Sequence, residues 1–340
     1  MHIELPSYDT PPAGAIRFNT DSNKLEVYRG GVGIGTTNQT GGWWQIDNFS
    51  ADNATGGTRG VFGGGFNYTN TIDYITISTT GNAIDFGDLL NAVQNQGSGC
   101  SSSTRGIFSG GTPSTNAISF ITISSTGNAQ DFGDISSARG YVGELSSSTR
   151  GIQIGGYVAP TATNIIEYIT IASTGDSKDF GDASSGISQT ATAASSTRGL
   201  FKVCFSATNT VEFITISTAG NSSDFGDLLF SRFASGGLSS STRAIFAGGY
   251  GSPTNENSIN YITIASTGNA VDFGDLTTAS AELAGVTDCR RGVFGTAYTP
   301  ARSNIIEYIT IQSLGNSIDF GDLTVARSGG SGCSNGHGGL

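Results

Sequence analysis

Short apolar runs, separated by polar and glycine-rich turns, recur along residues 58–340 with a nearly constant step. One run reads (Tyr/Phe)-Ile-Thr-Ile, a Gly-Asn or Gly-Asp turn follows it in every copy, and the phrase ends in Asp-Phe-Gly-Asp. Successive copies start 45 to 48 residues apart, and a period in the high forties is typical of propeller blades. The six copies cover residues 74–88, 120–134, 168–182, 213–227, 261–275 and 308–322.

Each repeat contains four segments that favour β-strands. In the first two repeats these are the small-residue segment 97–103 and the apolar runs 60–62, 72–77 and 83–86. The third run is rich in β-branched and aromatic residues, and the glycine turn that follows it predicts a hairpin. No segment has apolar residues at the three- and four-residue spacing of a helix, so we expect an all-β protein.

The two ends of the chain predict how the ring closes. Residues 53–57, which precede the first repeat, differ from the small-residue segments of the other repeats, whereas the tail at 326–335 resembles residues 97–102. The tail therefore supplies the strand that the first repeat lacks, which removes an exposed inner edge. The prediction is a six-bladed β-propeller of four-stranded antiparallel blades, closed by the C-terminal strand.

Residues 1–54 precede the repeats and are predicted to form a small β module, with the propeller at 55–340. Two strand-forming runs at 16–19 and 24–28 flank a polar turn. Trp43 and Trp44 are the only two tryptophans of the protein. They either pack the hairpin or form an attachment surface for a partner, and both readings stay open.

Composition and charge exclude some classes of partner. With a net charge of −11 and only 16 Lys and Arg, the chain has no basic stripe for nucleic acid. No run of eighteen apolar residues is present, so we expect no membrane insertion. The four cysteines lack paired metal-type spacing, and we expect buried thiols, with disulfides or a metal as the alternative.

The repeated aspartates are the strongest candidate for chemistry. Asp85 and Asp88, with their equivalents, could bind calcium, but six identical copies favour a structural role. In that reading one aspartate caps a turn or blade edge and another pairs with a repeated arginine such as Arg59 or Arg105. No metal and no cofactor are predicted.

Catalytic groups are sparse in the sequence. The two histidines, His2 and His337, lie in terminal segments, so a Ser-His-Asp arrangement has no central histidine. Six glutamates are conceivable glycosidase carboxylates but belong to no motif. No catalytic residue is predicted. The glutamates are Glu144, Glu167, Glu212, Glu256, Glu282 and Glu307.

The loops between the second and third strands differ from repeat to repeat, unlike the strands. Several contain an aromatic residue or a proline, and a rigid ring that presents variable loops suits recognition. We expect these loops to contact a glycan or another protein, with ordinary solvated loops as the alternative. The candidate contact residues are Tyr68, Tyr157, Tyr250 and Tyr298.

These motifs support a resemblance. The arginine near the start of the second strand and the glycine pair at its end, such as Gly63-Gly64, resemble kelch-type repeats without their late tryptophan. Over residues 58–340, Ser-Ser-Thr-Arg-Gly, Tyr-Ile-Thr-Ile and Asp-Phe-Gly-Asp resemble virion structural proteins of tailed phages that infect cyanobacteria. The kelch resemblance implies that the small-residue strand is innermost. Residues 15–28 with Trp43 and Trp44 resemble an element of phage fibre proteins, often near an attachment end.

The resemblance implies a non-enzymatic virion structural protein, assembled in the host cytoplasm, that serves as a tail fibre, tail accessory or capsid decoration. Other virion proteins would be its partners, and an oligomer is compatible with this role. The alternative is a recognition module that binds a host-surface glycan, and a third reading is a glycan-degrading enzyme.

Overall fold

The computed structural model describes residues 15–19, 24–29, 42–45, 57–66, 68–94, 97–204, 208–251 and 253–340. The chain divides into two compact units, Met1–Ser50 and Ala51–Leu340. Every regular element in these ranges is a β-strand, so the all-β prediction is confirmed. In the first unit, β1 (Ile16–Asn19), β2 (Lys24–Arg29) and β3 (Gly42–Gln45) form an antiparallel sheet in which Val27 pairs with Trp44.

The second unit is a six-bladed propeller of four-stranded antiparallel blades. Blade 1 contains β30 (Ser331–Ser334), β4 (Arg59–Gly63), β5 (Thr71–Thr76) and β6 (Ile84–Asp88), from the centre outward. Blade 2 contains β8 (Cys100–Ser101), β9 (Arg105–Ser109), β10 (Thr115–Thr122) and β11 (Gln130–Arg139). Blade 3 contains β12 (Gly143–Ser146), β13 (Arg150–Ile154), β16 (Ile165–Thr170) and β17 (Lys178–Asp182), with a small hairpin of β14 (Tyr157–Val158) and β15 (Thr161–Ala162).

The remaining three blades repeat this order. Blade 4 contains β18 (Thr192–Ala194), β19 (Arg198–Lys202), β20 (Thr208–Thr215) and β21 (Ser223–Arg232). Blade 5 contains β22 (Gly236–Ser239), β23 (Arg243–Ala247), β24 (Ser258–Thr263) and β25 (Val271–Asp275). Blade 6 contains β26 (Ala284–Thr287), β27 (Arg291–Gly295), β28 (Ile305–Thr310) and β29 (Ile318–Asp322).

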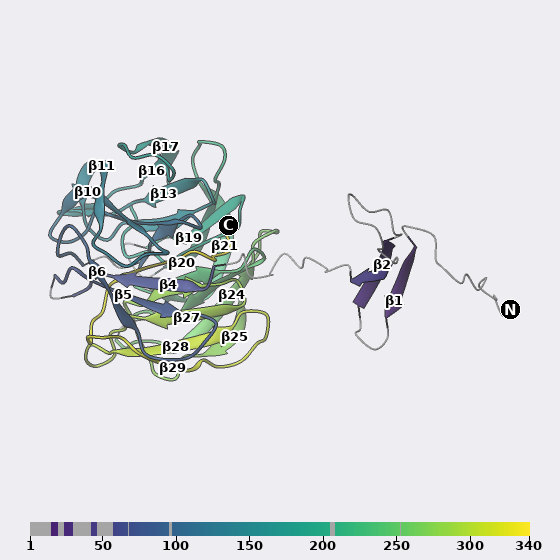
Figure 1. The fold of residues 1–340 in the computed structure, drawn as a ribbon. Helices are drawn as coiled ribbons and strands as arrows, with labels where there is room; N and C mark the ends of the chain where they lie inside the picture. The colour runs from purple at the N-terminus through teal and green to yellow at the C-terminus, as the bar shows by residue number, and fades with distance from the viewer. Residues whose placement is uncertain are drawn as a thin grey trace, which may run out of the picture. The chain divides into compact units, whose positions relative to one another are not determined.

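The C-terminal strand closes the ring, as the sequence predicts. β30 pairs antiparallel with β4, and Cys333 lies opposite Val61. Figure 1 shows the first strands of the propeller, β4 to β6, beside the last ones, β27 to β29. Residues from the two ends of the propeller are therefore joined by backbone hydrogen bonds, and β4 has no free inner edge.

Small residues in the innermost strands allow these strands to approach one another closely. The Ser101 hydroxyl donates to the Ser334 carbonyl (2.7 Å), and the Ser146 hydroxyl donates to the Ser101 carbonyl (2.9 Å). The close approach of the innermost strands also divides the predicted strand 97–103 into two parts. Its first part, β7 (Gly97–Ser98), pairs in parallel with β30 of blade 1, and only β8 pairs within blade 2.

The repeated phrase joins each blade to the next. In blade 2 the N–H of Gly127 donates to the Phe86 carbonyl of blade 1 (2.8 Å), and the Asn128 side chain accepts from the N–H of Asp88 (3.1 Å). A Cβ on Gly87 would lie 2.6 Å from the backbone of Gly127, so only glycine permits this approach. Equivalent contacts are present at all six blade interfaces.

The repeated arginine does not pair with the repeated aspartates, so that part of the sequence prediction is wrong. Arg59 instead donates to the Ile123 carbonyl of blade 2 (2.8 Å), and its guanidinium lies 4.6 Å from the ring centroid of Tyr74. All six arginines repeat this arrangement. A planar, weakly hydrated guanidinium can satisfy a carbonyl and cover an aromatic face together.

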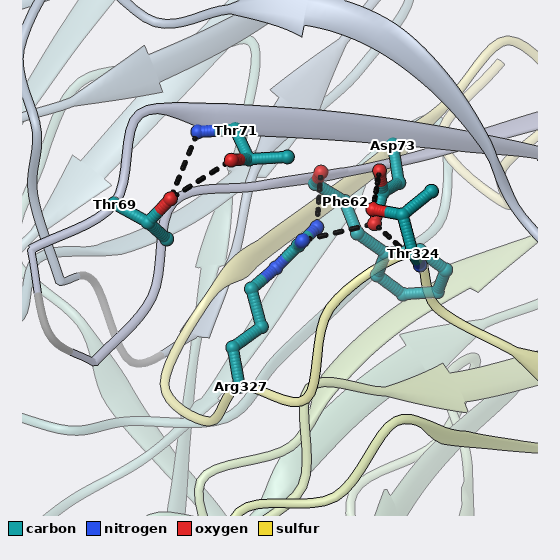
Figure 2. Close-up of polar contacts among 6 residues, drawn as sticks. All are labelled: Phe62, Thr69, Thr71, Asp73, Thr324 and Arg327. Carbon is teal, nitrogen blue, oxygen red and sulfur yellow. Dashed lines mark hydrogen bonds and ion pairs between the residues drawn. The ribbon is translucent and has the colours of Figure 1, made fainter.

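A second set of arginines lies fully buried at alternate interfaces. Arg327, which follows blade 6, forms an ion pair with Asp73 of blade 1 at 2.9 Å and donates to the Phe62 carbonyl (3.1 Å). Figure 2 shows both contacts, with the Thr324 hydroxyl donating to the same Asp73 carboxylate (2.6 Å). Arg139 of blade 2 forms the corresponding ion pair with Glu167 of blade 3.

The C-terminal residues fold against one end of the central channel. His337 Nδ1 accepts from the N–H of Gly339 (3.0 Å), so Nε2 carries the proton and donates to the Ser101 carbonyl (2.8 Å). Burial lowers the pKa of His337 from 6.5 to about 4. The neutral imidazole is therefore the form that holds the tail.

This pKa predicts acid sensitivity. As the pH decreases, the unfolded chain binds a proton at this histidine before the folded protein does. The free energy of unfolding therefore falls between about pH 6.5 and about pH 4. We expect the wild type to lose about 2 kcal/mol more than His337→Gln between about pH 7 and about pH 4.5. Urea unfolding of both proteins at the two pH values checks this. Equal losses would contradict the role assigned to His337.

Candidate functional site

The loops between second and third strands share one face of the propeller with the connections that lead from one blade to the next. Single β-bridges join the two sets of loops: Gly140 pairs with Tyr157, Phe233 with Tyr250, and Ala281 with Tyr298. We call this surface the loop face. The turn that holds His337 lies at the other end of the central channel, where the innermost strands meet the arginine turns.

A partial ring of backbone hydrogen bonds, which links five of the six connections between blades, follows the channel on the loop face. The N–H of Gln189 donates to the Tyr141 carbonyl (3.3 Å), that of Ala234 to Gln189 (3.2 Å), that of Glu282 to Ala234 (2.7 Å), and that of Gly329 to Glu282 (3.0 Å). All five residues have φ between 55° and 65°. Four of them are not glycine, and left-handed backbone at such residues is concentrated at functional sites.

Several polar and aromatic side chains of the loop face lie close to Tyr141. Burial raises the pKa of Tyr141, a hydrogen bond to Thr112 lowers it, and the nearby Glu282, Tyr68 and Tyr157 raise it further. Tyr68 and Tyr157, two of the predicted contact residues, therefore lie on the same side of the channel as this ring. The Tyr68 side chain is 51% exposed.

A pocket of about 230 Å³ opens beside the ring. Tyr250 and Tyr298, predicted from the loop sequences, both line it, and Phe233 contributes a third aromatic side chain. The rings of Phe233 and Tyr250 are 5.1 Å apart at 57°, so they form a tilted pair. Asn255 donates to the Tyr298 carbonyl (2.9 Å), which fixes the loop that carries Tyr298. The pocket is lined by Gln189, Phe233, Ala234, Tyr250, Asn255, Ala281, Glu282 and Tyr298.

The arrangement suits binding of a small polar molecule with apolar faces. Aromatic rings bury the C–H face of a ligand, while amide and carboxylate groups hydrogen-bond its polar edge. Within the described residues, no group of three or more His, Cys, Asp or Glu side chains is placed to hold a metal ion. The side chains that could contact such a ligand are those of Tyr250, Tyr298, Gln189, Asn255 and Glu282.

Most of the six glutamates considered for glycosidase chemistry lie away from the pocket. Glu144, Glu167, Glu212 and Glu307 are buried, and the last three accept hydrogen bonds that join neighbouring blades. Burial raises the pKa of Glu144 well above its usual range. Of the six, Glu282 lines the pocket.

The pocket residues outside the variable loops can be found from a second sequence pattern, which a comparison of the loops alone does not reveal. Gln189, Ala234 and Glu282 lie seven residues after the last aspartate of their repeat. Counting from that landmark finds a position whose residue differs in every repeat and which, in three repeats, lines the pocket. It occurs as Asn95, Tyr141, Gln189, Ala234, Glu282 and Gly329.

Other predicted features lie elsewhere. β3 contains Trp43 and Trp44, whose side chains lie outside what the structure describes. The four cysteines are buried free thiols. No helix in the described part of the chain is long and apolar enough to cross a membrane.

A cavity of about 40 Å³ in the central channel is the other hollow of note, lined by the innermost strands, Glu144 and His337. This volume admits a few water molecules, so it is too small for an organic ligand.

No protein-family model matches the chain, and no curated protein matches it either.

Proposed function

We propose that this protein is a non-enzymatic virion component of a tailed phage whose propeller binds a partner through its loop face. The observation that carries the recognition role is the pocket that joins Phe233, from the connection between blades 4 and 5, with Tyr250 and Tyr298, from the variable loops of blades 5 and 6. The virion role rests on the repeated motifs and on the fibre-like element at 15–28. Other virion proteins are proposed partners through the N-terminal module.

A host-surface saccharide is the ligand class that the pocket favours. Tyr250 and Tyr298 offer aromatic faces for the C–H face of a sugar ring, and Gln189, Asn255 and Glu282 offer amide and carboxylate groups for its hydroxyls. The second candidate ligand is a loop of another protein that carries an aromatic anchor residue. Such a loop would also bury more of the exposed ring of Tyr68.

Variants of the pocket test this proposal. We expect Tyr298→Ala and Glu282→Gln each to weaken saccharide binding by about tenfold, because one removes a stacking face and the other a charged acceptor. The measurement is a glycan array with the full-length protein, followed by titration calorimetry of the best ligand. Tyr298 is 41% exposed, so its truncation leaves the core intact.

Leu314→Ala is the matched control, since Leu314 is 59% exposed in the turn between β28 and β29, on the other face. It should leave affinity unchanged. Equal weakening of saccharide binding by all three variants would show that the pocket is not the binding site. Release of reducing sugar from host envelope polysaccharide would instead favour the glycan-degrading reading.

A further inference from the structure

The interface between blades 4 and 5 contains buried positive charge without a carboxylate to pair with it. Arg232 occupies the place of Arg139 and Arg327 and is fully buried. All its acceptors are neutral: Nη1 donates to the carbonyl and hydroxyl of Ser258 (3.0 and 2.8 Å). Nη2 donates to the side-chain oxygen of Asn260 (3.0 Å), where the other two interfaces have Glu167 and Asp73. Figure 2 shows the corresponding carboxylate in place at the interface of blades 6 and 1.

Lys202 adds a second cation to the same interface. It ends β19, at the position held by Gly63 and Gly295 in other blades, and a Cβ on those glycines would contact Phe108 and Phe62 of the following blade. Lys202 is likewise fully buried, next to blade 5. Burial lowers its pKa, the Cys204 thiol raises it, and Arg232 lowers it again, so Lys202 lies within electrostatic range of Arg232.

The unsatisfied atoms of this interface are all donors. Within the described residues, Lys202 Nζ and Asn260 Nδ2 are fully buried and have no hydrogen-bond partner. The Asn260 oxygen already accepts from Arg232 and from the N–H of Leu229, so the amide cannot be reversed without losing both bonds. Arg232 Nε is also unpartnered, although this is common to the three arginines.

The Glu256 carboxylate does not supply the missing acceptor. Burial lowers the pKa of Arg232 to about 10 and Glu256 raises it, but Glu256 accepts no hydrogen bond from Arg232 within the described residues. A buried donor without a partner destabilises the folded protein, and a buried cation does so more strongly. A negative ligand of small size would satisfy all of these groups.

We propose that a small monovalent anion, of the chloride class, binds between blades 4 and 5, held by Lys202 Nζ and Asn260 Nδ2 in the field of Arg232. The anion replaces the carboxylate that Glu167 and Asp73 provide at the equivalent interfaces. This site is independent of the pocket on the loop face and of its ligand.

Bromide substitution tests the site directly. Crystals of the full-length protein grown in bromide should show an anomalous peak within hydrogen-bond distance of Lys202 Nζ and Asn260 Nδ2. In solution, the melting temperature should rise by about 2 °C or more for each tenfold increase in chloride, with gluconate keeping the ionic strength constant.

Asn260→Asp should abolish this chloride dependence because it supplies the carboxylate within the chain. Asn257→Asp, which adds the same charge at an exposed position in the same connection, should leave it unchanged. No anomalous peak in the wild type, or a chloride dependence that survives in Asn260→Asp, would overturn the proposal.

Discussion

Deletion of residues 331–340 is expected to abolish cooperative unfolding of the propeller. The deletion removes β30, which pairs with β4 over the residues from Gly60 to Gly63, and it removes the tail that holds His337. Backbone groups of β4 that are buried in the closed ring would lose their partners, at about 1–3 kcal/mol each. The total loss, about 5 kcal/mol or more, is comparable to the stability of a typical domain.

Circular dichroism melts and limited proteolysis of the truncated protein measure this effect. A synthetic peptide of residues 328–340 should restore the transition when added, because the missing strand needs no covalent link to pair with β4. Deletion of Leu340 alone keeps β30 and is the control, with an expected change below about 1 kcal/mol. A truncated protein that melts like the full chain would show that β30 does not close the ring.

Asp73→Asn is expected to destabilise the protein by about 3–5 kcal/mol. The substitution leaves Arg327 charged and buried without a negative partner, because the Phe62 carbonyl and the new amide oxygen are both neutral acceptors. Removing one partner of a buried pair costs far more than removing both. The double variant Asp73→Leu with Arg327→Met should therefore recover most of the loss.

Urea unfolding in a double-mutant cycle measures the coupling between the two side chains. Asp85→Asn is the matched control, because Asp85 is an exposed aspartate of the same blade. It should change the free energy of unfolding by less than about 0.5 kcal/mol. A coupling below about 1 kcal/mol would mean that the pair does not hold blades 6 and 1 together.

The blade count and the closure of the ring could be predicted because both are written into the sequence as repetition. The tail at 326–335 resembles residues 97–102. Because only the first repeat lacks an innermost strand, the C-terminal strand can complete no other blade. The division of residues 97–103 between two blades could not be predicted, since it depends on how closely Gly99 and Gly332 approach at the axis.

The role of the repeated phrase could not be read from the sequence alone. Its Gly-Asn turn looks like a hairpin requirement, yet the turn also binds the preceding blade through residues such as Gly127 and Phe86, about forty positions apart. The partners of Arg59 could not be read from the sequence either, because the Ile123 carbonyl lies 64 positions away in the next blade and the Tyr74 ring is reached only through strand pairing within blade 1.

Part of the candidate site could be predicted from the sequence. The loops that contain Tyr250 and Tyr298 differ from blade to blade, which identifies these residues as candidates. Phe233 and Glu282 belong to the connections between blades, and only the fold shows that these connections meet the variable loops at one pocket.

Adsorption to cells tests the central claim, that the loop face recognises a host-surface saccharide. Fluorescently labelled full-length protein would be incubated with intact cyanobacterial cells and with cells stripped of surface polysaccharide, and bound fluorescence would be measured by flow cytometry. We predict binding to intact cells that is lost on stripping and reduced about tenfold by Tyr298→Ala but not by Leu314→Ala. Binding that persists on stripped cells, or is equally strong for Tyr298→Ala, would contradict the proposed function.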